Sequence, residues 1–171
     1  MIGTIITGLL ILTSLYFIKK ASKKKSKLDE NGYTIHRLPL LYGIGGIIPL
    51  GICAIIIVAS IFKKESSNLS NIIPIILLFA FLGIMMCLMV WMNKISMNGE
   101  EIIQRNMWGK IKTIKLNEID SINFDKVFLH LNISDNHNKI KCHEHLIGFD
   151  EIISNISNKT QITKAEMGIT E

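Results

Sequence analysis

The chain has 171 residues, 49% of them hydrophobic, and a formal net charge of +5. Its mean hydropathy of +0.36 is high for a soluble protein and indicates an integral membrane protein. Residues 1–93 contain nine Lys and Arg against three Asp and Glu, whereas residues 94–171 contain ten Lys and Arg against eleven Asp and Glu. The excess positive charge therefore lies in residues 1–93, which are the more apolar part of the chain. A nucleic-acid-binding protein would carry its basic patch on the polar, folded part, so nucleic acid is not an expected partner.

Three segments without charged side chains are long enough to cross a membrane as helices. They cover residues 2–18, 38–62 and 72–92. A helix needs about 17–25 predominantly apolar residues to span the hydrocarbon core of a bilayer. We therefore predict a membrane domain over residues 1–93 with three transmembrane helices.

The segment between the first two predicted spans, residues 19–37, is rich in cations. Its seven basic residues are Lys19, Lys20, Lys23, Lys24, Lys25, Lys27 and Arg37, whereas segment 63–71 has only two. Because short loops rich in Lys and Arg stay in the cytoplasm, this imbalance places segment 19–37 on the cytoplasmic side of a multi-pass protein of the cell membrane. Its N-terminus is expected outside and its C-terminal part in the cytoplasm. The seven cations are also candidate contacts for anionic lipid headgroups, although setting the topology alone would explain them.

Glycines gather in the second predicted span, at Gly43, Gly45 and Gly46. One interpretation is a flexible helix that lines a transport path, and the other is a close-packing surface for a neighbouring helix. We favour packing, because the three predicted spans contain no Asp, Glu, Lys, Arg or His, and transport sites usually need an ionisable side chain.

After Asn93 the pattern changes to short runs in which apolar and polar residues alternate. Six strands are predicted, at 94–97, 100–106, 110–116, 119–124, 127–133 and 139–143. One helix follows, with a single apolar face formed by Phe149, Ile152, Ile153 and Ile156. Strands followed by a helix indicate an α+β domain over residues 94–159, and residues 160–171 are expected to be a flexible tail.

Three parts of this domain carry a resemblance to a known family. They are the sequence ISMNGEEIIQRNMWGKIKTIKLNEIDSINF, the hairpin with Leu129, Leu131 and Ile140, and the sequence GFDEII at the start of the helix. Together they resemble the bacterial pleckstrin-homology-like (PH-like) domains that are attached to small groups of membrane helices. The resemblance implies a small cytoplasmic antiparallel β-sandwich or barrel, commonly of seven strands and closed by the C-terminal helix. It implies neither catalytic residues nor a cofactor.

The sequence CHEH, within the stretch IKCHEHLIGFDEI, places four potential metal ligands in a row. In an extended strand, alternate side chains point to opposite faces, so the four cannot converge on one ion. A metal site made of other ligands stays possible in one hairpin register, the one that pairs Ile133 with Ile140. This register places His130 opposite His143 with His145 on the same face, which would make a three-histidine site. We expect no metal site, because the chain lacks a recognised ligand spacing.

No catalytic motif is present: the sequence has no phosphate-binding glycine loop, no nucleophile elbow and no HExxH. We therefore expect a non-enzymatic, membrane-anchored interaction module that contacts the lipid bilayer. It would bind a protein partner or scaffold a membrane complex at the cytoplasmic face. The alternative is a small channel-like or transport accessory protein whose helices form homo-oligomers.

Overall fold

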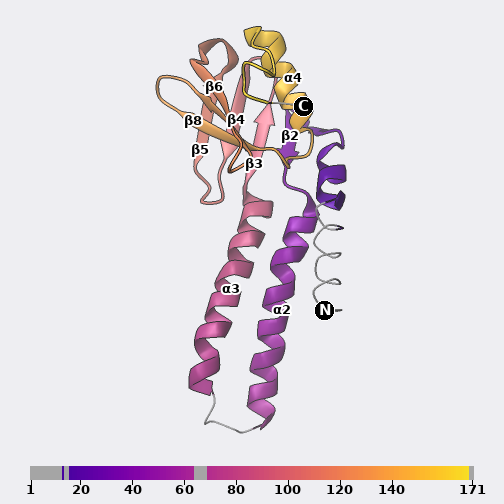
Figure 1. Ribbon diagram of the computed structural model, residues 1–171, viewed down its shortest axis with the longest axis vertical. Helices are drawn as coiled ribbons and strands as arrows, with labels where there is room; N and C mark the ends of the chain where they lie inside the picture. The colour runs from indigo at the N-terminus through magenta and orange to yellow at the C-terminus, as the bar shows by residue number, and fades with distance from the viewer. Residues whose placement is uncertain (1–12, 14–15, 64–68, 170–171) are drawn as a thin grey trace.

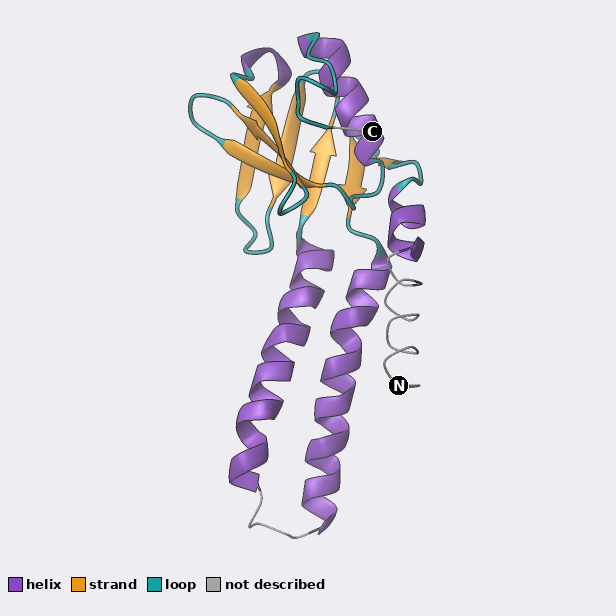
Figure 2. Cartoon of the chain, in the orientation of Figure 1, coloured by secondary structure: helices purple, strands orange, loops and turns teal. Residues whose placement is uncertain are grey.

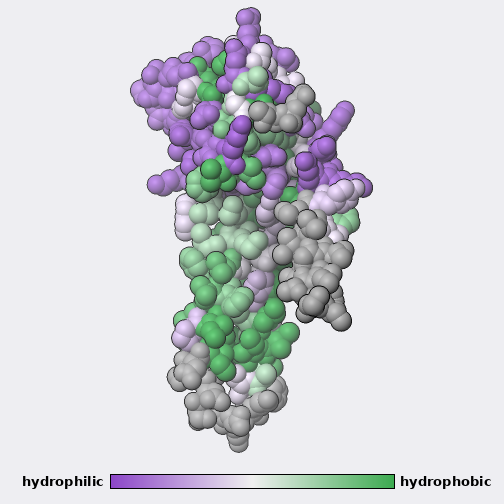
Figure 3. All heavy atoms as spheres, in the orientation of Figure 1, coloured by the Kyte–Doolittle hydropathy of each residue, from purple (hydrophilic) through white to green (hydrophobic). Residues whose placement is uncertain are grey.

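The computed structural model describes residues 13, 16–63 and 69–169. Two long helices, α2 (Leu40–Lys63) and α3 (Leu69–Met92), lie side by side and carry a β-rich domain at one end (Figure 1). Both helices are long and apolar enough to cross a membrane, judged by length and composition, and their surfaces are apolar where the β-domain is polar (Figure 3). The expected span over 2–18 lies almost entirely outside the described residues. Residues 16–22, which include its last three residues, are helical.

Glycine permits the close approach of α2 and α3. A Cβ atom on Gly46 would lie 2.8 Å from the carbonyl oxygen of Gly83, and a Cβ on Gly83 would lie 2.8 Å from that of Gly46. No side chain fits at that distance. A Cβ on Gly43 would touch Val90 at 3.6 Å. The prediction that this glycine cluster is a helix-packing surface is confirmed.

Two antiparallel sheets form the β-domain (Figure 2). The first has the order β1 (Lys27–Leu28), β2 (Thr34–Arg37), β3 (Lys94–Met97), β4 (Glu101–Arg105) and β5 (Ile111–Lys115). After a 3-10 turn, η2 (Leu116–Glu118), the second sheet follows with β6 (Ser121–Asp125), β7 (His130–Ser134) and β8 (Lys139–His143). The six strands predicted after Asn93 are confirmed. The fifth begins three residues later than expected, because residues 127–129 form a turn in which Leu129 has a φ of 53°.

Residues 19–37 were expected to form a loop, and the structure corrects this. β2 pairs along its whole length with β3, from Thr34 opposite Met97 to Arg37 opposite Lys94. The chain therefore leaves the first sheet at β2, forms the α2–α3 hairpin, and returns to the same sheet as β3. The helix hairpin is an insertion between two neighbouring strands of the β-domain.

One apolar core lies between the sheets and α4 (Phe149–Thr160). The four residues of the predicted helix face, Phe149, Ile152, Ile153 and Ile156, are all buried, which confirms that prediction. Leu131, Ile133, Ile140 and Cys142 face them with no exposed surface. Burial raises the pKa of the Cys142 thiol, so this cysteine serves as a small apolar core residue.

The expectation of a flexible tail after residue 160 is wrong for residues 161–169. Met167 is completely buried, and Ile162 and Ile169 pack against the core. The Phe124 N–H donates a hydrogen bond of 2.8 Å to the Met167 carbonyl, which holds the segment along β6. Residues 161–169 are ordered by tertiary contacts, because their few apolar side chains pack on a surface that other elements of the fold form.

The two sheets are not joined into a closed barrel. In the described part of the chain, side chains connect β4 and β5 of the first sheet to β8 and the turn before it, where a closed barrel would have a backbone ladder between β5 and β8. The Gln104 amide donates to the Lys141 carbonyl at 2.9 Å, and the Lys141 N–H donates back to Gln104 at 3.3 Å. Asn138 donates to the Thr113 carbonyl at 3.2 Å. The architecture is thus α+β with two apolar helices and two open antiparallel sheets.

Candidate functional site

A groove of about 480 Å³ lies where the β-domain meets the ends of α2 and α3, and we call it the hairpin groove. Its polar lining consists of Lys24, Lys25, Lys27 and Arg37. Its apolar lining consists of Ile35, Leu38, Leu40, Val90, Trp91 and Ile147. Cations thus border an apolar surface that continues into the two apolar helices.

Local pairing fixes these cations in place. Lys27 pairs with Ile35 in the short β1–β2 hairpin, and Arg37 pairs with Lys94 at the end of β2. The Ser26 hydroxyl donates to the Glu151 carboxylate, which ties the segment to the first turn of α4. The cations are therefore held by the sheet and by α4, not carried on a free loop.

The structure divides the seven predicted lipid-contact residues into two groups. Four of them, Lys24, Lys25, Lys27 and Arg37, line the hairpin groove. Lys19 and Lys23 instead line a second pocket of about 270 Å³, together with Lys126, Lys164 and the acidic Glu144 and Asp150. Lys20 is exposed and lines neither pocket.

Among the described residues, no carboxylate forms an ion pair with the cations of the hairpin groove. Across residues 16–60 and 72–169, the one ion pair within 4.0 Å joins Lys115 to Glu118. The seven basic residues of segment 19–37 are all exposed. Uncompensated cations beside an apolar floor suit an amphiphile that has an anionic head and apolar chains.

The histidine register considered from the sequence is confirmed. Ile133 pairs with Ile140 and His130 with His143, and the imidazole rings of His130 and His143 lie 4.9 Å apart. His145 is also 4.9 Å from His143, centroid to centroid. Burial first, and then the two neighbouring imidazoles, lower the pKa of His143 to about 4.

Two ring nitrogens of this cluster have hydrogen-bond partners within the protein. Nδ1 of His143 accepts the His145 N–H at 3.1 Å, and Nδ1 of His145 hydrogen-bonds with the Tyr42 hydroxyl. Among the described residues, no group of three or more His, Cys, Asp or Glu is arranged to hold a metal ion. The geometry thus gives no support to the three-histidine alternative, and the rings pack as a polar cluster beside α2.

Two polar features were missed by the sequence analysis. His36 is completely buried in β2, where Nδ1 contacts the Ile147 carbonyl at 2.9 Å and Nε2 contacts Thr34 at 3.2 Å. Burial lowers its pKa. A third groove, of about 270 Å³, runs along the seam of the sheets and is lined by Gln104, Asn106, Lys110, Lys112, Lys139 and Lys141. The signal for this lysine groove was the Lys-x-Lys spacing, which occurs at residues 110–112, where β5 begins, and at residues 139–141 in β8.

Comparisons of the chain with models of known families, with curated proteins and with solved structures find no match. The resemblance to PH-like domains therefore rests on the quoted sequence motifs. The features of the molecule that point to a function are the hairpin groove and the two apolar helices beside it.

Proposed function

We propose that this chain is a membrane-anchored, PH-like interaction module that binds anionic phospholipid in the hairpin groove. The observation that carries the proposal is the group of cations beside the apolar lining of the hairpin groove, none of them in an ion pair with another described residue. They lie at the end of two helices long and apolar enough to cross a membrane. The bound lipid would fix the β-domain at the cytoplasmic face. There the domain would bind a protein partner or scaffold a membrane complex.

The proposed topology has α2 and α3 as transmembrane helices and the segment 2–18 as a third. The basic segment 19–37 and the β-domain lie in the cytoplasm, following the positive-inside rule. The fold supports keeping these two parts on one side, because β2, from the basic segment, pairs with β3 of the β-domain.

The strand count supports a PH-like assignment for the β-domain. The sequence alone accounted for six strands, and family members commonly have seven. With β2, the strands from β2 to β8 number seven, and α4 follows them. Side-chain hydrogen bonds connect the two sheets where a closed barrel would have backbone pairing: Gln104 of β4 bonds with Lys141 of β8, and the Lys112 ammonium of β5 donates to the Lys139 carbonyl of β8.

Anchoring fits the two helices better than transport does. Their interface is closed by backbone contact at Gly46 and Gly83, so packing accounts for the glycine cluster. The described spans Leu40–Ser60 and Ile72–Met92 contain no Asp, Glu, Lys, Arg or His to serve as a transport site. We therefore assign these helices to anchoring and to lining the hairpin groove.

Lipid retention by the purified 171-residue chain tests the proposal. In detergent, we expect native mass spectrometry to show phosphatidylglycerol bound in preference to phosphatidylcholine. The triple variant Lys24→Gln, Lys25→Gln, Lys27→Gln should weaken that preference about 10- to 100-fold, since each lysine near an anionic surface contributes about 1 kcal/mol or less.

The matched control removes three lysines from the lysine groove instead, as Lys112→Gln, Lys139→Gln, Lys141→Gln. It takes away the same charge and should leave the preference for phosphatidylglycerol nearly intact. Equal losses in the two triple variants would show that general charge, and not the hairpin groove, recruits the lipid.

A further inference from the structure

Two loop tips of the β-domain expose large apolar side chains. One is Trp108, 65% exposed, in the loop between β4 and β5. The other is the pair Val127 and Phe128, 83% and 67% exposed, in the turn between β6 and β7. None of the three belongs to the core. Apolar side chains at the tips of two separate loops call for a partner outside the domain.

Strand register places the Trp108 loop at the end of the domain from which the helices leave. β3 begins at Lys94, directly after α3 ends at Met92. Lys94 pairs with Arg105, which in turn pairs with Ile111. The loop 106–110 therefore projects past the first rung of the sheet, toward the end of α3 (Figure 2).

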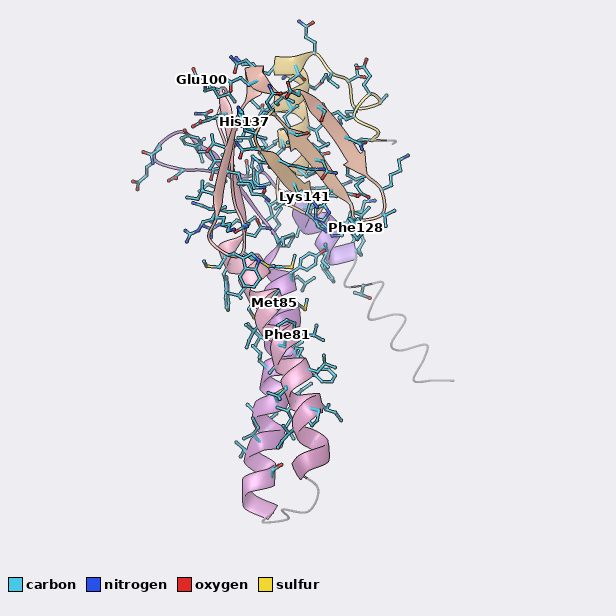
Figure 4. All side chains as sticks on the ribbon, turned by 90° about the vertical axis from the view of Figure 1, so that its left-hand side faces the viewer. Phe81, Met85, Glu100, Phe128, His137 and Lys141 are labelled. Carbon is cyan, nitrogen blue, oxygen red and sulfur yellow. The ribbon has the colours of Figure 1, made fainter. Side chains whose placement is uncertain are left out.

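Register and a side-chain contact place the second tip at the same end. His130, the first residue of β7, pairs with His143 in β8. His145, two residues further on, hydrogen-bonds with Tyr42 in the first turn of α2. The turn before His130 thus lies level with the start of α2. Figure 4 shows Phe128 at this end of the domain, nearer to the helices than His137.

We propose that these two tips insert into the interfacial layer of the same bilayer that α2 and α3 cross, so that the β-domain docks on the membrane surface. The inference rests on the proposed function, since it requires the helix hairpin to span. Indole and phenyl side chains favour the membrane interface. Trp91, 57% exposed at the end of α3, is the other of the chain's two tryptophans, and both lie at this end of the domain.

Charge around the tips suits an anionic lipid surface. Arg105 and Lys110, both exposed, flank the Trp108 loop, and Lys126 precedes Val127 in the second tip. The carboxylate of the acidic neighbour Asp125 accepts the N–H groups of Val127 and Phe128 within the turn, at 3.0 and 3.1 Å. Each tip therefore has exposed apolar side chains with basic side chains next to them. The apolar side chains could enter the interfacial layer while the basic ones contact anionic headgroups.

The connections leave the domain little freedom to lift away. Two residues, Leu38 and Pro39, separate β2 from α2, and Asn93 alone separates α3 from β3. Both residues of the first connection are buried. Once the hairpin spans the bilayer, the tips are held near its surface, and insertion requires little further ordering of the chain.

Tryptophan quenching in vesicles tests this inference with the full chain. Trp91→Phe leaves Trp108 as the single tryptophan, and Trp108→Phe leaves Trp91. Each variant is reconstituted in phosphatidylglycerol and phosphatidylcholine, with part of the latter brominated on its acyl chain near the glycerol. We expect Trp108 to lose about as large a fraction of its emission as Trp91. Phe128→Trp, in a background without the native tryptophans, should behave in the same way.

His137→Trp in that background is the control, because His137 is exposed in the turn between β7 and β8, away from the helices. It should keep its emission. Quenching of Trp91 with no quenching of Trp108 would overturn docking and leave the proposed anchor standing. Quenching of neither would refute both the spanning hairpin and the docking. Quenching at position 137 equal to that of Trp108 would also overturn docking by the two tips, because the end of the β-domain away from the helices would then contact the lipid as closely as the tips do.

Discussion

A few residues connect the basic segment to α4 and so decide the shape of the hairpin groove. The Gly148 N–H donates to the Ser22 carbonyl at 2.9 Å, and the Ser26 hydroxyl donates to Glu151. His36, buried in β2, contacts the Ile147 carbonyl. These contacts meet at the N-terminus of α4, where Gly148 has a left-handed φ of 74°.

Gly148→Ala tests this junction. The backbone there requires a conformation that costs alanine about 1 kcal/mol, and a Cβ would lie 2.9 Å from Nδ1 of the buried His36. Gly109→Ala is the matched control, with a φ of 77° but nothing within 4 Å of its Cβ. Thermal unfolding followed by circular dichroism should show that the free energy of unfolding falls by about 2–4 kcal/mol for Gly148→Ala and by about 1 kcal/mol for Gly109→Ala. Equal losses would mean that the junction tolerates a side chain.

At the scale of elements, local pattern predicted most of the fold. α2 and α3 are readable because each holds an unbroken apolar run, and α4 because Phe149, Ile152 and Ile156 recur at helical spacing. The six later strands alternate apolar and polar residues over enough length to be recognised. Each of these signals lies within the element itself, so no knowledge of the rest of the fold is needed.

β2 and the segment after α4 lack such a signal. β2 has four residues, and its strand conformation comes from pairing with β3, which lies beyond the whole helix hairpin in the sequence. Met167 stands among polar residues, and its burial depends on a surface made by other elements. Contacts between distant segments, not local preference, determine both.

The sequence predicted which basic residues belong to the candidate site, but it did not predict the groove that they line. The seven cations are evident in the sequence, but their division between the hairpin groove and the second pocket depends on the fold of the β1–β2 hairpin. The apolar floor was also hidden, because Trp91 and Leu40 belong to segments that read only as spans. Only the folded junction combines charge with an apolar surface.

The close contact between α2 and α3 predicts that a side chain added at Gly46 destabilises the protein. Gly46→Ala would place a Cβ 2.8 Å from the Gly83 carbonyl and must separate the helices, at a cost of about 1–3 kcal/mol. Gly51→Ala, in the same helix, meets nothing within 4 Å and should be neutral or slightly stabilising. Thermal unfolding of the full chain in detergent distinguishes the two. A neutral Gly46→Ala would show that the helices do not need this close approach.

For the whole molecule, the main feature is the insertion of the helix hairpin into the sheet. Because β2 and β3 are neighbours, the two helices leave the β-domain side by side and bring its basic segment to their ends. The hairpin groove and both apolar loop tips lie at that same end. A single orientation at a bilayer would therefore satisfy the groove, the tips and the apolar helices together.

The most direct test of this account is the accessibility of two single cysteines in intact cells. With Cys53, Cys87 and Cys142 replaced by alanine, Ser67→Cys marks the connection between α2 and α3, and His137→Cys marks the β-domain. A membrane-impermeant thiol reagent should label position 67 in intact cells and position 137 only after the membrane is opened. Labelling of position 137 in intact cells, or of position 67 only after opening, would contradict a hairpin that crosses the membrane with its β-domain in the cytoplasm.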